Sequence, residues 1–170
     1  DFVLLGRNAH LGLTKWETNQ DIKKAMAAMK LTNIDDLSER NLGQISGGEL
    51  QRAMLAMAIT QESPVMLLDE PTSNLDLSHQ SKVLNLLTKM HNEKRGITVM
   101  AIHDLTLAAQ YSDRMILISE GQIFADGKPS EVLTKSNIAE TYGADVIIIP
   151  HPKGGSPVIL PTSEDYPKVI

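Results

Sequence analysis

The chain has 170 residues, of which 42% are hydrophobic and 22% charged, a balance that suits one globular domain with a sizeable core. Its net charge of -5 gives no support for a nucleic-acid partner, which would need a concentrated positive surface. The absence of cysteine excludes disulfides and cysteine-based metal sites and suits a reducing cytosol. No signal peptide opens the sequence, and no apolar run is long enough to cross a membrane.

Residues 1–60 predict helices. In residues 21–31, apolar side chains recur at helical spacing, as Ile22, Ala25, Met26 and Met29. A second helix is expected directly after Gly47-Gly48, running to about Thr60. It is apolar nearly all round, which predicts a buried helix that ends before Ser63-Pro64.

From Val65 onwards the pattern changes to strands that alternate with helices. Residues 65–68 and 97–102 are short apolar runs, which predict strands covered on both faces. The remaining predicted elements are helices at 78–93 and 105–111, a hairpin of 115–119 with 122–125, short helices at 129–135 and 138–142, and an irregular tail at 151–170. This alternation predicts an α/β fold with a mostly parallel sheet.

Two acidic residues, Asp69 and Glu70, directly follow the first apolar strand. The carboxyl end of such a strand is where open α/β sheets bind ligands. An Asp there can hold Mg²⁺ through water, and the adjacent Glu can face a water that attacks a γ-phosphate. Two acids that merely end a strand at the surface are the alternative, but the following Pro-Thr-Ser-Asn-Leu-Asp, residues 71–76, favours the functional interpretation.

Ser46-Gly47-Gly48 precedes the Ala- and Met-rich helix. Two glycines allow a backbone to approach an anion closely, and the start of a helix favours negative charge. Ser46 can cap the helix or donate to a phosphate. His103 follows the second strand and could contact a phosphate or orient water, or it could be a histidine satisfied by its neighbours.

Taken together, these segments resemble the ATP-binding-cassette (ABC) ATPases along roughly residues 1–150. Residues 45–49 resemble the signature motif, 65–70 the Walker B strand with its catalytic glutamate, 73–76 the D-loop, and His103 the switch histidine. The opening Leu-Leu-Gly-Arg-Asn-Ala-His at 4–10 and the segment 121–133 resemble the importer branch for iron–siderophores, haem and vitamin B12, although zinc and manganese importers share much of this pattern. Glu49 stands where many relatives have Gln, and Asn74 where many have Ala.

The resemblance implies a truncated P-loop NTPase-type fold. Expected parts are a partial helical signature subdomain at 1–60, the Walker B and switch half of the ATPase core at 61–150, and the tail at 151–170. No Gly-x-x-x-x-Gly-Lys-Ser/Thr phosphate loop occurs in the 170 residues, so we expect this chain alone to be inactive and the full-length parent to hydrolyse ATP. By resemblance, Glu70 and His103 are catalytic and Asp69 positions Mg²⁺ through water. The residues expected to bind nucleotide are Ser46, Gly47, Gly48, Glu49 and Asp76.

The resemblance also implies partners and a location. Two ATPase subunits would meet head to tail with ATP between them, and the helical subdomain would contact membrane permease subunits. The subunit would then lie in the cytoplasm, peripheral to the inner face of the cell membrane, and no nucleic acid is expected. Two alternatives stay open: a non-catalytic fragment that acts as a binding or scaffold module, and a non-transport ABC ATPase of the kind that serves iron–sulfur assembly or DNA repair.

Overall fold

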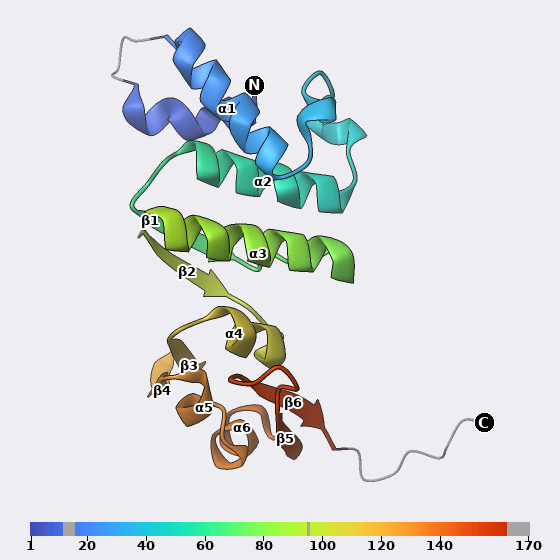
Figure 1. Cartoon of the computed structure of the whole chain (residues 1–170), viewed down its shortest axis with the longest axis vertical. Helices are drawn as coiled ribbons and strands as arrows, with labels where there is room; N and C mark the ends of the chain where they lie inside the picture. Colours follow the sequence, from blue (N-terminus) through green and yellow to red (C-terminus); the bar gives the residue numbers. More distant parts are fainter. Residues whose placement is uncertain (12–15, 95, 163–170) are drawn as a thin grey trace, which may run out of the picture. The chain divides into compact units, whose positions relative to one another are not determined.

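The computed structural model describes residues 1–11, 16–94 and 96–162. The chain divides into two compact units, Asp1–Ala101 and Ile102–Ile170, whose elements are labelled in Figure 1. Along the described parts, no helix combines the length and the apolar character needed to cross a membrane.

The first unit begins with helices, as predicted. They are the 3₁₀ helix η1 (Val3–His10), α1 (Asn19–Leu31), the short 3₁₀ turns η2 (Asp35–Leu37) and η3 (Leu42–Gln44), and α2 (Gly47–Thr60). The start of α1 is fixed by a capping box, in which Thr18 Oγ1 accepts from the Asp21 amide and the Asp21 carboxylate accepts from the Thr18 amide. The small side chains of Ala25 and Ala28 on its buried face allow α1 to pack closely on α2.

An ion-pair network centred on the buried Arg7 joins η1, α1 and the end of α2. Arg7 is only 5% exposed, and its guanidinium donates to Asp21 Oδ1 at 2.8 Å, the Thr60 carbonyl at 3.0 Å and Glu62 Oε2 at 3.0 Å. Close packing requires Gly6 here, because a Cβ at that position would overlap the carbonyl oxygen of Met57. The network therefore fixes how three helical segments meet.

The strands of the first unit form a parallel pair, β1 (Val65–Asp69) with β2 (Ile97–Ala101), connected by α3 (Leu77–Lys94). Val65 pairs with Ile97 and Asp69 with Ala101, so the carboxyl ends of both strands lie at the same edge. The predicted apolar stripe of α3 is confirmed, since Val83, Leu84 and Leu87 are buried.

The prediction that both strands are covered on both faces is wrong in this chain. Met66, Leu68 and Met100 pack against the core of the first unit, whereas the alternate residues are exposed. Leu67 is 73% and Ile97 60% exposed. Successive side chains of a strand point to opposite faces, and only one face of this pair has helices packed on it within the described residues.

The second unit contains three helices and two antiparallel hairpins among its described residues. These are α4 (Leu105–Tyr111), β3 (Met115–Ser119) with β4 (Gln122–Gly127), α5 (Pro129–Val132), α6 (Lys135–Tyr142), and β5 (Val146–Pro150) with β6 (Pro157–Pro161). A separate core, which includes Ala109, Leu117 and Ile138, lies among them. Thr106 of α4 joins β6, donating to the Ile159 carbonyl and accepting from its amide.

The prediction of an irregular tail at 151–170 is wrong for Pro157–Pro161. This segment forms β6, which pairs with β5, while residues 163–170 of the predicted tail lie outside the described residues. The boundary between the two compact units lies after Ala101, whereas the sequence analysis expected boundaries between functional parts at 60 and 150. Those boundaries, which divide the chain by motif, stay a prediction.

Candidate functional site

Asp69 and Glu70 lie at the carboxyl edge of the parallel pair. Asp69 is the last residue of β1 and is exposed, and Glu70 follows it directly and is half-buried. β1 delivers them because Met66 and Leu68 pack against the core and the strand ends at this edge. Two carboxylates are thus placed where open α/β sheets bind ligands.

The backbone of Glu70 is held in an unusual conformation. Its φ is +45°, in the left-handed region that a residue with a Cβ rarely adopts. Its amide donates to the carbonyl of Ala101 in β2 at 3.0 Å. Its own carbonyl accepts from the Ser73 amide at 3.0 Å, from Ser73 Oγ at 2.9 Å and from Gln51 Nε2 at 2.9 Å. Strained backbone of this kind persists only where its surroundings over-determine it.

Ser46 caps α2, so the first of its two predicted roles is present in the structure. Its Oγ accepts from the Glu49 amide at 3.3 Å, and the Glu49 carboxylate accepts from the Ser46 amide at 2.6 Å. A hydrogen bond from the Ser46 amide, followed by one from the Ser46 side chain, holds the pKa of the Glu49 carboxyl below its usual range, which keeps it ionised.

Gly47 and Gly48 have different surroundings although they are adjacent. A Cβ built on Gly48 would lie 3.2 Å from the Asn74 carbonyl oxygen and 3.3 Å from Leu75 Cδ2. A Cβ built on Gly47 would meet nothing within 4 Å, and neither glycine has a positive φ. Packing against the 70–76 loop thus explains the glycine at 48, whereas no described contact requires one at 47.

Asp76 lies at the other end of this loop and holds the start of α3. Its Oδ1 accepts from the His79 amide at 2.8 Å and lies 3.0 Å from His79 Nδ1. These bonds, led by the one from the His79 amide, lower the pKa of Asp76, so the carboxylate is charged. A predicted contact of Asp76 with nucleotide stays a prediction.

His103 belongs to the second unit. It is exposed and lies two residues before α4. Asp104 caps α4, its Oδ1 accepting from the Leu107 amide at 2.9 Å. The cap fixes the backbone next to His103.

Within the first unit, the structure thus brings the start of α2 against the loop that follows β1. The link includes Gln51, for which no role was predicted from the sequence. A usable signal was present: Gln51 is a polar residue that lies three and four residues after the two glycines, on their face of the helix.

Among residues 1–11, 16–94 and 96–162, no group of three or more His, Asp or Glu side chains could hold a metal by itself. A magnesium ion that arrives with a nucleotide needs less, because substrate phosphates and waters supply most of its ligands. The exposed carboxylate of Asp69 at the edge of the sheet fits that requirement.

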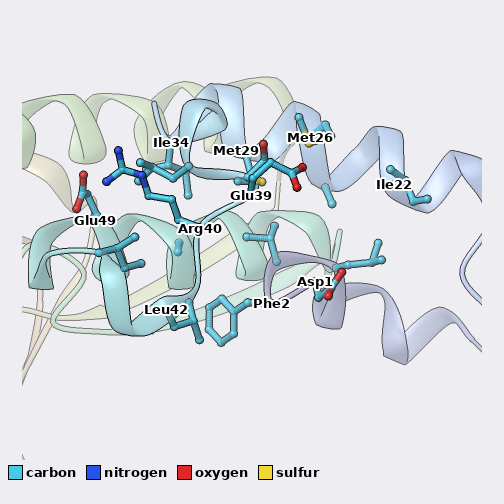
Figure 2. Close-up of a pocket in the computed structure, with 17 residues that line it drawn as sticks. Asp1, Phe2, Ile22, Met26, Met29, Ile34, Glu39, Arg40, Leu42 and Glu49 are labelled. Carbon is cyan, nitrogen blue, oxygen red and sulfur yellow. The ribbon is translucent and has the colours of Figure 1, made fainter.

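A groove of about 270 Å³ lies in the helical part of the first unit, between η1, α1 and the start of α2. Figure 2 shows Arg40 and Glu49 close together at one end of it and Ile22 at the other. Its walls include apolar side chains such as Met26 and Met29. The groove thus combines apolar walls with charged groups, which include Asp1 and Glu39 as well as Arg40 and Glu49.

The sequence matches known proteins over most of its length. The ABC transporter family model matches residues 4–73. The chain is 38% identical over 168 residues to the ferric enterobactin transport ATP-binding protein of Escherichia coli, covering 98% of this chain and 62% of that protein. It is 38% identical over 156 residues to the hemin import ATP-binding protein of Thermobifida fusca, covering 89% and 55%. For a cobalamin import ATP-binding protein of Halobacterium salinarum, the identity is 36% over 159 residues, covering 94% and 39%.

Solved structures give the same result for the fold. An inward-facing transporter assigned to the metal-chelate type of ABC transporter superposes with a TM-score of 0.82 at 27% identity, covering 96% of this chain and 66% of that one. A dimeric ATP-binding cassette in a post-hydrolysis state, bound to ADP and phosphate, has a TM-score of 0.60 at 28% identity, covering 69% and 51%.

The chain therefore spans at most 62% of the length of these three relatives. The predicted α/β fold of the P-loop NTPase type is confirmed by the solved structures. The described residues contribute one parallel and two antiparallel strand pairs to it. By its motifs, its fold and its relatives, this chain contains part of an ABC transporter family domain and resembles the ATP-binding subunits of siderophore, haem and cobalamin importers.

Proposed function

We propose that this chain is part of an ATP-hydrolysing subunit that drives an importer of iron–siderophore, haem or cobalamin-like compounds. One observation carries the proposal of hydrolysis: Glu70 stands at the carboxyl edge of the parallel pair in a left-handed backbone held from both sides. Glu120 has the same left-handed backbone in an ordinary turn. At Glu70 this backbone is held by both β2 and α2, and it carries a carboxylate at the edge where open α/β sheets bind ligands.

In the proposed reaction, the Glu70 carboxylate accepts a proton from the attacking water. The water oxygen forms a bond to the γ-phosphorus, and the bond from that phosphorus to the β–γ bridging oxygen breaks, which releases ADP and phosphate. His103 would contact the γ-phosphate, as the resemblance implies. Asp69 would hold Mg²⁺ through water, and that ion would neutralise charge that develops on the phosphate oxygens.

The start of α2 is proposed to serve a second nucleotide, held by a partner subunit in a head-to-tail pair. The Ser46 hydroxyl would donate to a phosphate oxygen, and the open space at Gly47 permits the phosphate to approach the first amides of the helix. Glu49 and Asp76 would lie near the same nucleotide, although both carboxylates already hold helix starts in this chain. The solved cassette dimer in a post-hydrolysis state supports a paired arrangement in general.

Membrane permease subunits are the proposed partners of the helical part. The apolar groove between η1, α1 and α2 offers them a surface. The names of the relatives support an import function for siderophores, haem and cobalamin. The choice among these compounds would be made by the permease and its binding protein. The subunit would then be peripheral to the cytoplasmic face of the membrane.

The test is Glu70→Gln in the full-length subunit. Hydrolysis should fall about 10²-fold or more, the range typical of a lost general base, while MgATP binding persists. Glu120→Gln is a matched control, because Glu120 is also a glutamate with positive φ, at +50°, but lies in the turn between β3 and β4. If the Glu70 variant hydrolyses ATP as fast as the Glu120 variant, the proposed role of Glu70 is wrong.

A further inference from the structure

Gln51 makes a contact that the proposed reaction does not yet use. It lies in the second turn of α2, half-buried, and its side-chain amide donates to the carbonyl of Glu70 at 2.9 Å across 19 residues of sequence. The two other donors to that carbonyl, the amide and hydroxyl of Ser73, belong to the same loop as Glu70 and move with it. Gln51 is instead anchored in a helix whose buried side chains, such as Leu55, belong to the core.

The geometry of Glu70 makes this anchor consequential. With φ at +45°, the residue is in a conformation that the chain does not favour by itself, and it must be held there from outside. β2 holds the amide side through Ala101, and α2 holds the carbonyl side through Gln51. Both peptide planes that flank Glu70 are thereby fixed, and these planes set the direction in which its side chain leaves the backbone.

The same helix touches the loop a second time. Gly48 packs against Asn74 and Leu75, less than one helical turn before Gln51. Asn74 is also left-handed, with φ at +59°. Two strained residues of one loop therefore rest on one face of α2, at the end where Ser46 and Gly47 are placed.

We infer that Gln51 is a positioning residue, which sets the direction of the Glu70 carboxylate and couples it to the N-terminal turn of α2. This inference rests on the proposed function, in which Glu70 accepts the proton of the attacking water. It adds that two parts of one chain are linked: the start of α2, proposed to contact the nucleotide of the partner subunit, and the Glu70 carboxylate, proposed to act on the nucleotide of the same subunit. A small rotation of Glu70 would leave nucleotide contacts elsewhere intact while misdirecting the water, and a misplacement of about 1 Å can cost about 10²-fold in rate.

The test uses the full-length subunit and the variant Gln51→Met, which keeps the length of the side chain and removes the donor. The expected result is a fall in kcat of about tenfold to 10²-fold, with the KM for MgATP changed less than about twofold. Gln51→Glu, with the same shape and an acceptor in place of the donor, should lower kcat at least as much. It also provides a second variant if the methionine variant does not fold.

Gln80→Met is the matched control. Gln80 is also a glutamine whose amide donates to a carbonyl of this loop, that of Thr72 at 3.3 Å, but it projects from α3 and does not reach Glu70. Its replacement should leave kcat within about twofold of the parent. The melting temperatures of the two methionine variants should be similar, because each loses one hydrogen bond to the loop.

Combining Gln51→Met with Glu70→Gln separates positioning from a general structural role. If Gln51 acts through the carboxylate, its replacement costs little further hydrolysis once that carboxylate is gone. An equal fold-loss in both backgrounds, or an unchanged kcat in Gln51→Met alone, would overturn the inference. A Glu70→Gln variant that keeps its activity would instead refute the proposed function, so the two failures are distinguishable.

Discussion

Replacing Gly47 and Gly48 separately by alanine tests whether the start of α2 is built for a ligand or only for packing. The two positions lie in the same helical turn and neither has a positive φ, but their surroundings differ. A methyl group at 47 enters open space, whereas at 48 it meets the Asn74 carbonyl at 3.2 Å and Leu75 at 3.3 Å. Alanine also gains helix propensity over glycine, by up to about 1 kcal/mol in a helix interior and less in a first turn.

Helix propensity and steric overlap change the free energy of unfolding in opposite directions. Gly47→Ala should be neutral or slightly stabilising, because it gains propensity without a clash. Gly48→Ala has the same gain offset by overpacking, which costs about 1–3 kcal/mol where the neighbours must shift. The two variants should therefore differ by about 1–3 kcal/mol in unfolding free energy, or about 3–9 °C in melting temperature at roughly 3 °C per kcal/mol.

The assay measures melting temperature and ATP hydrolysis on the same two variants of the full-length subunit. If a phosphate approaches the open space at Gly47, Gly47→Ala should lose most hydrolysis while keeping its stability and its ability to bind MgATP as a monomer. Parental hydrolysis in Gly47→Ala would refute the ligand role of that glycine. Equal melting temperatures for the two variants would refute the packing argument for Gly48.

Four further predictions concern the chain itself. Arg7→Met leaves Asp21 buried without its cation, so the melting temperature should fall clearly. Hydrogen bonds from Thr18, and then from Arg7, hold the pKa of Asp21 well below its ordinary value. The stability that the ionised Asp21 contributes is therefore present above about pH 4 and lost as the pH falls further. Asp21→Asn should flatten that part of a pH–stability curve. The 170-residue chain alone should neither hydrolyse MgATP nor bind it tightly, which turnover assays and calorimetry would show; turnover that disappears in Glu70→Gln would contradict this. The isolated chain should also self-associate through the exposed face and edges of the β1–β2 pair, with weak hydrogen-exchange protection at 97–102, and a monodisperse monomer with strong protection there would contradict the expectation.

Helix positions could be predicted because their signals are local. The boundaries of α2 follow from Ser46 at its start and Ser63-Pro64 after its end, and α3 follows from a stripe whose members, including Leu84 and Leu87, are all buried or half-buried. Each signal lies within one or two helical turns of the element that it defines. For the same reason the carboxylates at the end of β1 could be found from an apolar run followed by two acids.

Burial of the strands could not be predicted in the same way. A continuous apolar run indicates that both faces suit a core, but it does not show whether anything covers both of them. Leu67 and Ile97 are apolar and exposed, while Met66 and Met100 on the opposite face are packed. The sequence therefore identified the strands correctly and their surroundings incorrectly.

β6 was missed because its flanking residues are typical of loops. Pro157 and Pro161 stand at its two ends, where a strand tolerates a residue without an amide donor, and between them Val158, Ile159 and Leu160 are ordinary strand residues. Gly154 and Gly155, both with positive φ, form the turn that brings this short run back to β5. Proline and glycine marked the limits of a strand here rather than the absence of one.

The contacts that hold Glu70 were beyond local reasoning for a different reason. The motifs at 45–49 and 65–70 suggest two separate roles, one at a helix start and one at a strand end. In the folded chain the two segments are in contact: Gly48 packs on Asn74, and the Gln51 side chain donates to the Glu70 carbonyl. A substitution in either segment should therefore be interpreted through the other: a loss of hydrolysis in an α2 variant identifies a nucleotide contact only if the same variant retains the effect after Glu70 has been neutralised.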